Sequence, residues 1–333
     1  MGNDELRKTV VLVTGRDRRE LVRQALLALG EKFEQRAKAA KKIFIHPNLV
    51  TPHRQAASTH VEAVRGVVDH LSLIRDDEIL IGDASYYETK KAFHAFGYET
   101  LKRSGNVRLV DLNDDETVES FAYAPLEAGR HGRPPSPQDG PLTGYTADLK
   151  KRPIGFSKTV AESDFNIVVV PAKMHSYGIV SLAVKTHVIG SQVVKASPFG
   201  IHGRWPWNHT GYKPFHLTLV DVYVEHPAHL AIIDGTQAME GEGPTSGREV
   251  NLGWLIASLN PVAADALAVY LMGIDPQNIG YLCHLNQKGF GPIEPVEMYI
   301  IGPGGRASGP ELVEGFRREL ARPDSYPEIL NWR

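Results

Sequence analysis

The segment Phe165–Val170 reads Phe-Asn-Ile-Val-Val-Val, and Pro-Ala-Lys-Met-His follows it as far as His175. A short apolar run of this kind, rich in β-branched residues, is typical of a strand buried on both faces of a sheet. Two polar side chains, Lys173 and His175, lie just beyond it. Because ligands bind beyond the carboxyl ends of strands in open α/β sheets, this segment predicts a central strand with a binding site at its end.

Strand-like and helix-like patterns alternate along the rest of the chain. In the first part, strand-like patterns cover 9–14, 42–45, 78–81 and 107–112, and helix-like patterns cover 18–29, 59–74 and 88–101. In the second part, helix-like patterns cover 178–189 and 260–272, and strand-like patterns cover 230–233 and 296–301. This alternation predicts an α/β fold with a doubly wound, mostly parallel sheet, helices on both faces, and two Rossmann-like halves.

The composition suggests where these halves begin and end. Residues 1–128 form the first α/β half, and residues 154–305 form the second half, which carries a cluster of Lys and His. Residues 129–153 are rich in Pro, Gly and charge, and predict a loop excursion or a domain boundary. Residues 306–333 read as a polar tail.

Charge and cysteine content exclude several classes of function. The 333 residues include 37 basic and 39 acidic side chains, for a net charge of −2, which gives no general attraction to nucleic acid or to anionic membranes. No apolar run is long enough for a membrane helix. The single cysteine, Cys283, cannot hold an intrinsic iron–sulfur cluster. We expect a cytoplasmic protein and leave open whether it forms an oligomer.

Cationic side chains and histidines follow the run at 165–170 closely. They are Lys173, His175, Lys185, His187, Lys195, His202, Arg204 and His209. Such a group predicts a pocket for a small anionic ligand, with Lys173 as an anion clamp and His187 and Lys195 as further binding residues. Lys185 has apolar neighbours that would make its amine more nucleophilic, so Lys185 and His175 are the candidate catalytic residues.

Other polar residues occur in turns that this fold would bring to the same edge. The candidate binding residues among them are Asn48, Asp83, Ser85, Asp234, Glu240 and Asp265. Asp265 lies within an apolar helix-like segment, so it either lines the pocket or holds a neighbouring turn. His46 is a candidate metal ligand, although its spacing to other histidines matches no specific zinc signature.

Several motifs in order resemble the prokaryotic domain-of-unknown-function family 362. They are Pro47-Asn48-Leu49-Val50, Phe96-Gly97-Tyr98, Pro171–His175, Ala183-Val184-Lys185, the string from Asp234 to Gly247, and Asn260–Asp265. The resemblance covers most of residues 40–290, and the string from Asp234 is its most specific part. It implies the fold and the site more than a function, because no general activity is settled for that family.

Members of that family often occur with iron–sulfur ferredoxin modules, so the resemblance implies an external ferredoxin as a partner. This chain departs from the family pattern at three points. It has His46 where a lysine usually precedes Pro-Asn, Lys185-Thr186-His187 where Lys-Asn is usual, and no ferredoxin cysteines.

A more distant resemblance is to the nickel-pincer lactate racemase family. His175, Lys185 and His202 are spaced by ten and seventeen residues, which is similar to that family's acid/base histidine, tethering lysine and metal-binding histidine. The resemblance implies a lysine-tethered nickel-pincer nucleotide as cofactor, with His202 as a nickel ligand.

Three functions remain open on this basis. The leading hypothesis is an enzyme that binds a small anionic substrate or cofactor in a Lys/His pocket and performs isomerase- or racemase-like proton transfer. The alternatives are a redox protein of an iron–sulfur or flavin system served by an external ferredoxin, and a non-catalytic module that binds an anion or a metal.

Overall fold

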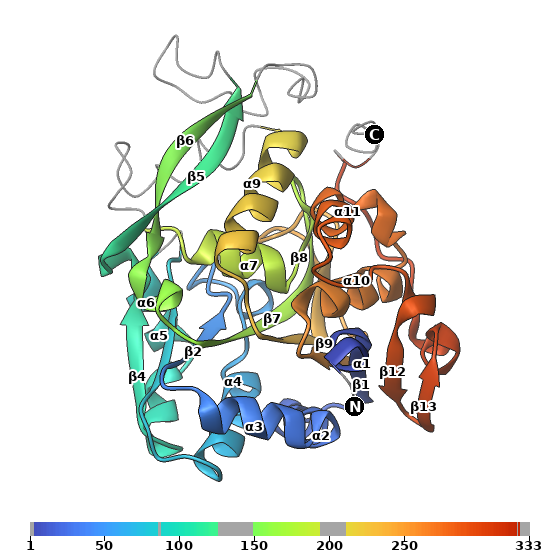
Figure 1. The fold of residues 1–333 in the computed structure, drawn as a ribbon, viewed down its shortest axis with the longest axis horizontal. Helices are drawn as coiled ribbons and strands as arrows, with labels where there is room; N and C mark the ends of the chain where they lie inside the picture. The colour runs from blue at the N-terminus through green and yellow to red at the C-terminus, as the bar shows by residue number, and fades with distance from the viewer. Residues whose placement is uncertain (1–2, 86–87, 126–148, 194–210, 325, 327–333) are drawn as a thin grey trace.

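A single large sheet runs through the protein (Figure 1). The computed structural model describes residues 3–85, 88–125, 149–193, 211–324 and 326. The order of strands along the main path of the sheet is β13-β12-β1-β11-β9-β7-β2-β3-β4, and the short strands β10 and β8 add to β9 and β7. On this path only β11 and β13 run against the other strands, so the α/β, mostly parallel sheet expected from the sequence is confirmed.

The bounds of the strands are as follows. They are β1 (Thr9–Thr14), β2 (Ile43–Pro47), β3 (Ile79–Asp83), β4 (Val107–Asp111), β5 (Thr117–Pro125), β6 (Leu149–Ser157), β7 (Phe165–His175), β8 (Ile179–Ser181), β9 (Leu230–Glu240), β10 (Arg248–Val250), β11 (Trp254–Ser258), β12 (Tyr299–Gly302) and β13 (Gly305–Ser308).

The α-helices among the described residues have these bounds. They are α1 (Asn3–Lys8), α2 (Arg18–Leu29), α3 (Glu31–Ala39), α4 (Val61–Ser72), α5 (Thr89–Ala95), α6 (Lys158–Ala161), α7 (Ala183–Gly190), α9 (Tyr212–Glu225), α10 (Pro261–Leu271) and α11 (Gly280–Gln287).

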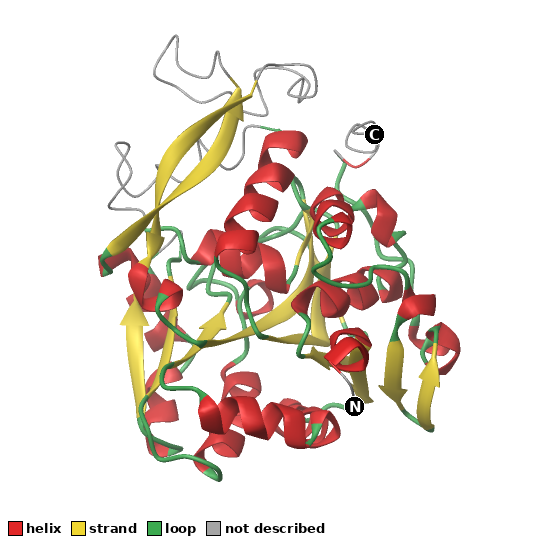
Figure 2. Ribbon diagram, viewed as in Figure 1, coloured by secondary structure: helices red, strands yellow, loops and turns green. Residues whose placement is uncertain are grey.

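Helices cover both faces of the sheet (Figure 2). Alternate residues of β7 point to opposite sides: Val168 and Val170 pack with α7, α9, α10 and α11, whereas Ile167 and Val169 pack with α2, α3 and α4. All eleven residues of β7 are buried. The run at 165–170 is therefore a central strand covered on both faces, which explains its nearly uninterrupted apolar sequence.

Two helices begin where their capping residues predict. The Asp17 side chain accepts a hydrogen bond from the backbone N–H of Glu20 at the start of α2. The Asn260 side chain accepts hydrogen bonds from Val262 and Ala263 at the start of α10, and Pro261 occupies the first position of that helix. Both arrangements supply partners for N–H groups that a helix start leaves unpaired.

Two helix-like patterns are interrupted. The pattern at 178–189 begins as β8, which turns back antiparallel onto β7, and only then becomes α7. The pattern at 88–101 divides into α5 and a short 3₁₀-helix because Gly97 adopts a left-handed conformation between them. In both places the local apolar spacing suits a helix, and the surrounding structure overrides it.

Strands from the two predicted halves share the sheet. Strand β1 from the first half lies between β11 and β12 from the second half, and β2 pairs with β7. Of the predicted excursion at 129–153, residues 129–148 lie outside the described residues. Its last five residues belong to β6, which pairs with β5 in an antiparallel ribbon, and β5 contacts α9 (Figure 1).

The predicted tail folds back onto the body of the protein. After β13, the backbone of Leu320 donates a hydrogen bond to Met272, and the backbone of Gly241 donates one to Ala321. Within the described residues, no helix is long and apolar enough to cross a membrane.

We expect Asn260→Ala to lower the free energy of unfolding by about 2–3 kcal/mol. The substitution removes the cap of α10 and also the hydrogen bonds that the Asn260 amide donates to the carbonyls of Arg7 and Phe290. Asp17→Ala, which removes only a surface cap, should cost about 1 kcal/mol. Urea unfolding of the two variants tests this difference, and equal losses would contradict it.

Candidate functional site

A cavity of about 440 Å³ opens where the carboxyl ends of β2, β3 and β7 meet the first turns of α7. Five of the residues that the sequence predicted line it: Asn48, Asp83, Ser85, His175 and Lys185. The turn at 242–246, which follows β9 and packs on the end of β7, forms a further wall. Residues from distant parts of the chain thus meet at the edge of the sheet where an open α/β fold presents a ligand.

The imidazole of His175 is held from behind by the backbone. Its Nδ1 accepts hydrogen bonds from the backbone N–H groups of Tyr177 and Gly178, at 3.0 and 3.1 Å. Its ring stacks on Phe215 with 5.8 Å between centroids. Because Nδ1 accepts two hydrogen bonds, the ring proton lies on Nε2. A second proton on Nδ1 would break both bonds, so this environment favours a neutral imidazole.

Lys185 belongs to the first turn of α7 and is only 6% exposed. The position of this turn is set by Asp265 from α10, whose two carboxylate oxygens accept hydrogen bonds from the backbone N–H groups of Ala183 and Val184. The hydroxyl of Tyr281 donates a third hydrogen bond to this carboxylate, at 2.9 Å. Of the two roles considered for Asp265, the structure supports the structural one: it caps α7 and does not line the cavity.

Burial raises the pKa of Asp265 from 3.8 to about 7, although its three hydrogen bonds act in the opposite direction. The carboxyl group is completely buried, so desolvation of its charged form outweighs those bonds.

Lys173 lies beneath the cavity rather than in its wall. It is completely buried, and its ammonium group donates to Asn48 Oδ1 at 2.8 Å and to the carbonyl of Ala57. The Asn48 amide in turn donates to Thr186 Oγ1 on α7 at 3.0 Å. Burial, and then the nearby charge of Lys185, lower the pKa of Lys173 well below its usual range. Lys173 therefore orients Asn48, and its two partners keep it from acting directly as an anion clamp.

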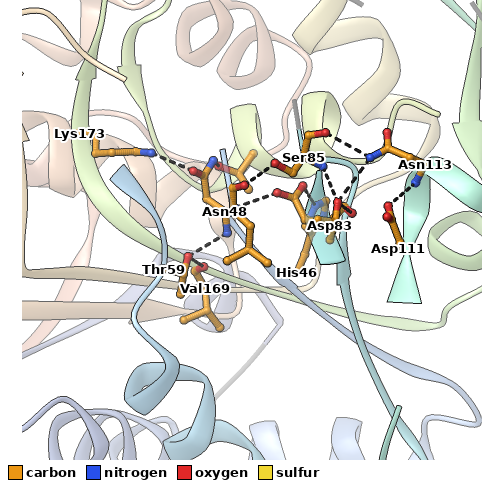
Figure 3. A network of polar contacts seen from close by, with 12 residues as sticks. His46, Asn48, Thr59, Asp83, Ser85, Asp111, Asn113, Val169 and Lys173 are labelled. Carbon is orange, nitrogen blue, oxygen red and sulfur yellow. Dashed lines mark hydrogen bonds and ion pairs between the residues drawn. The ribbon is translucent and has the colours of Figure 1, made fainter. Parts of the chain in front are cut away.

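Asp83 joins two loops at the cavity floor (Figure 3). One carboxylate oxygen faces His46 Nε2 at 3.2 Å, and the other accepts a hydrogen bond from the backbone N–H of Leu49 at 2.8 Å. The hydroxyl of Ser85 donates to the carbonyl of Leu49. Gly190 permits this packing, because a Cβ atom there would lie within 2.5 Å of both Asp83 and His46.

The other predicted binding residues lie away from the cavity lining. His187 is completely buried and pairs with the carbonyl of His226 at 2.9 Å. Asp234 forms an ion pair with Arg18, at 2.7 Å. Glu240 pairs with Arg248 and with the backbone N–H of Ala321. Lys195 and His202 lie outside the described residues.

Two contributors to the cavity are not among the candidate site residues. Glu242 and the turn after it line the cavity, whereas the nearby Glu240 was chosen as a candidate. Arg54 donates to the carbonyls of Thr245 and Gly247, at 2.8 and 2.6 Å, and so joins the loop after β2 to this turn. The Gly-Glu-Gly-Pro composition was a signal for the turn, but no local pattern in the sequence pointed to Arg54.

No group of three or more His, Cys, Asp or Glu side chains could hold a metal ion in the part of the chain that the structure describes. His46, the predicted metal ligand, is completely buried and directs Nε2 to Asp83.

The family model for the domain of unknown function DUF362 matches residues 43–131 and 142–270, more than half of the sequence. The chain belongs to this family. The match includes the motifs quoted above up to Asp265, and with them every described residue of the cavity wall. No curated protein matches this DUF362 chain in sequence.

Two solved structures are similar to this DUF362 protein. The lactate racemase apoprotein from Thermoanaerobacterium thermosaccharolyticum is 14% identical, with a TM-score of 0.46, and the match covers 82% of this chain and 59% of that one. A structural-genomics target from Thermotoga maritima is 12% identical, with a TM-score of 0.41, and the match covers 78% and 60%. The chain thus spans less than two thirds of either structure.

Asp265→Asn should alter how stability depends on pH. A carboxyl pKa that folding raises means that the folded state holds its proton more tightly than the unfolded state. Stability from this proton is therefore complete at pH values below 3.8 and is lost as the pH rises to about 7. Asp265→Asn should not show this loss of stability between low and neutral pH, which is at most about 4 kcal/mol in the wild type.

Urea unfolding of both proteins between pH 4 and pH 8 measures this effect. Asp17→Asn, which alters the exposed N-cap of α2, controls for the loss of a capping carboxylate. Parallel stability curves for wild type and Asp265→Asn would refute the assignment.

Lys173→Met should loosen the loop that Lys173 holds without unfolding the protein. Removing a buried cation relieves a desolvation cost, so the free energy of unfolding should change by less than about 2 kcal/mol. Amide hydrogen exchange in residues 48–58 should become faster, because Asn48 and Ala57 lose their common partner. Lys90→Met, at an exposed site, is the control. Unchanged exchange in that loop would contradict the role given to Lys173.

Proposed function

We propose that this protein is an enzyme that binds a small anionic substrate in the cavity and transfers a proton within it, as isomerases and racemases do. The observation that supports this proposal is that His175 and Lys185 line the same cavity, with the His175 proton directed to Nε2 by the backbone. Lys185 is the one Lys or Arg side chain among the described lining residues, so its protonated form would attract an anionic substrate and its neutral form would act as the base.

His175 serves in this proposal as a neutral hydrogen-bond donor. Its Nε2–H would bind the substrate oxygen on which negative charge develops, while Nδ1 keeps its two backbone donors. A donor that is already oriented stabilises such charge without reorganisation. This differs from the acid/base histidine expected by resemblance, because taking up a further proton would cost both backbone hydrogen bonds.

Lys185 would carry the proton. Lys185 is only 6% exposed, and in its neutral form a lysine amine can accept a proton from carbon. The amine takes a proton from a carbon next to a carbonyl group, and the electron pair of that C–H bond moves to form an enolate. The resulting ammonium group returns the proton to a carbon atom, so charge and atoms balance without an oxidant.

A lysine-tethered nickel-pincer nucleotide would require Lys185 as its anchor and at least one further ligand for the metal. Lys185 fits the first requirement, because it reaches the cavity. The predicted further ligand, His202, lies outside the described residues. The proton transfer proposed here uses only side chains of the chain itself.

The test is hydrogen–deuterium exchange at carbon. Wild-type protein is incubated in D₂O with a panel of 2-oxo, 2-hydroxy and 2-amino carboxylic acids, and deuterium incorporation is followed by mass spectrometry. We expect incorporation into at least one acid, a loss of 100-fold or more in Lys185→Met, and a loss of about 100-fold in His175→Phe. Lys158→Met, at the surface, should exchange like wild type.

The non-catalytic alternative gives a different result in the same experiment. A binding module would be stabilised thermally by one of the acids without any deuterium incorporation, and Lys185→Met would retain that stabilisation. Absence of incorporation from the whole panel, together with such stabilisation, would replace the enzyme proposal.

A further inference from the structure

Three completely buried polar atoms near the C-terminal end of α7 have no hydrogen-bond partner among the described residues. They are Nδ1 of His46, Nδ1 of His187 and Oγ of Ser191. Buried polar atoms in folded proteins nearly always have partners, and each one without a partner costs about 1–3 kcal/mol. An explanation for this group therefore has to supply hydrogen bonds.

The three residues belong to one region of the fold. His187 and Ser191 are four residues apart at the end of α7, which places them on one side of the helix. The ring centroids of His46 and His187 are 5.8 Å apart. Gly190 brings the helix against the His46 ring, because a Cβ atom at Gly190 would lie 2.5 Å from His46 Nε2 and 3.1 Å from its Cε1.

The hydrogen bonds made by Nε2 of each ring decide whether the two Nδ1 atoms are donors or acceptors. His46 presents Nε2 to the carboxylate of Asp83, and His187 presents Nε2 to the carbonyl of His226. Both partners are acceptors, so each Nε2 carries the proton. In a ring with this tautomer Nδ1 is an acceptor, and burial lowers the pKa of His187 well below its usual range, which favours the neutral form of that ring.

The missing partner must therefore donate two hydrogen bonds, and it can accept one from the hydroxyl of Ser191. We propose that a single buried water molecule binds here, bridging Nδ1 of His46, Nδ1 of His187 and Oγ of Ser191. Water has two donors and an acceptor, and buried waters typically make about three hydrogen bonds to groups that the protein leaves unpaired.

A divalent cation fits this group poorly. It would have two neutral nitrogen ligands and a hydroxyl but no carboxylate or thiolate, in a place where Phe44 packs on His46 and Phe156 on His187. The cost of burying that charge among aromatic rings is not offset by any anionic ligand.

This water would give His46 a defined function. The water would donate a hydrogen bond to Nδ1 of His46, and Nδ1 would carry no proton of its own. The ring proton then stays on Nε2, directed at Asp83 in the cavity floor. His46 is thus a positioning residue for the Asp83 carboxylate, and the water maintains its tautomer. The inference does not depend on the proton-transfer proposal, because none of its groups takes part in that transfer.

Nuclear magnetic resonance of protein labelled with ¹⁵N-histidine tests the water site. We expect both His46 and His187 in the neutral form with the proton on Nε2, and a cross-peak from a long-lived water to the protons of one or both rings. Ser191→Ala should shift both Nδ1 signals, because the water loses its third partner. Ser181→Ala, which removes an equally buried and unpaired hydroxyl on β8, should leave both signals in place.

Three results would overturn the inference. A proton on Nδ1 of either ring would contradict the tautomers, and the absence of a long-lived water in the folded wild type would contradict the occupant. Addition of Co²⁺ that produces a visible absorption band, absent in His187→Phe, would show a metal site instead. The measurements on wild type decide the question even if the Ser191→Ala variant does not fold.

Discussion

The structure depends on how the polar carboxyl end of β7 is buried. A strand covered on both faces can carry polar side chains only if other parts of the protein supply their hydrogen bonds. Lys173 has Asn48 and Ala57, and His175 has two backbone N–H groups from the turn that follows it. Because these partners come from the segment after β2 and the turn between β7 and β8, meeting this requirement also assembles two walls of the cavity.

The third wall depends on α7, and α7 depends on Asp265. Two hydrogen bonds from the first turn of the helix to one buried carboxylate set where Lys185 lies relative to His175. Burial of this carboxyl group raises its pKa to about 7 against the effect of those hydrogen bonds, so the protein becomes less stable as the pH rises toward neutrality. At the other end of α7, Gly190 allows His46 and Asp83 to pack against the helix. Both ends of one short helix therefore determine the shape of the site.

Much of the fold could be predicted from the sequence, because the signals for it are local. The apolar run at 165–170, the cap at Asn260 and the alternation of strands with helices each need only a few neighbouring residues. The candidate site could be predicted in part: the rule that ligands bind at the carboxyl ends of strands selected Asn48, Asp83, Ser85, His175 and Lys185, all of which line the cavity. It also selected Asp234 and Glu240, whose ion pairs with Arg18 and Arg248 depend on which segments pack together.

By itself, the sequence determined that this chain is an α/β protein with a Lys- and His-rich segment after a central strand, since hydrophobic periodicity and capping residues act over short distances. Only the tertiary structure decided what each polar group does there. Lys173 holds Asn48 in place and does not clamp an anion. Asp265 caps α7, and His175 is a neutral hydrogen-bond donor. The physical reason is that the role of a buried polar group depends on its hydrogen-bond partners, and these partners are 125 residues away for Lys173 and 82 for Asp265.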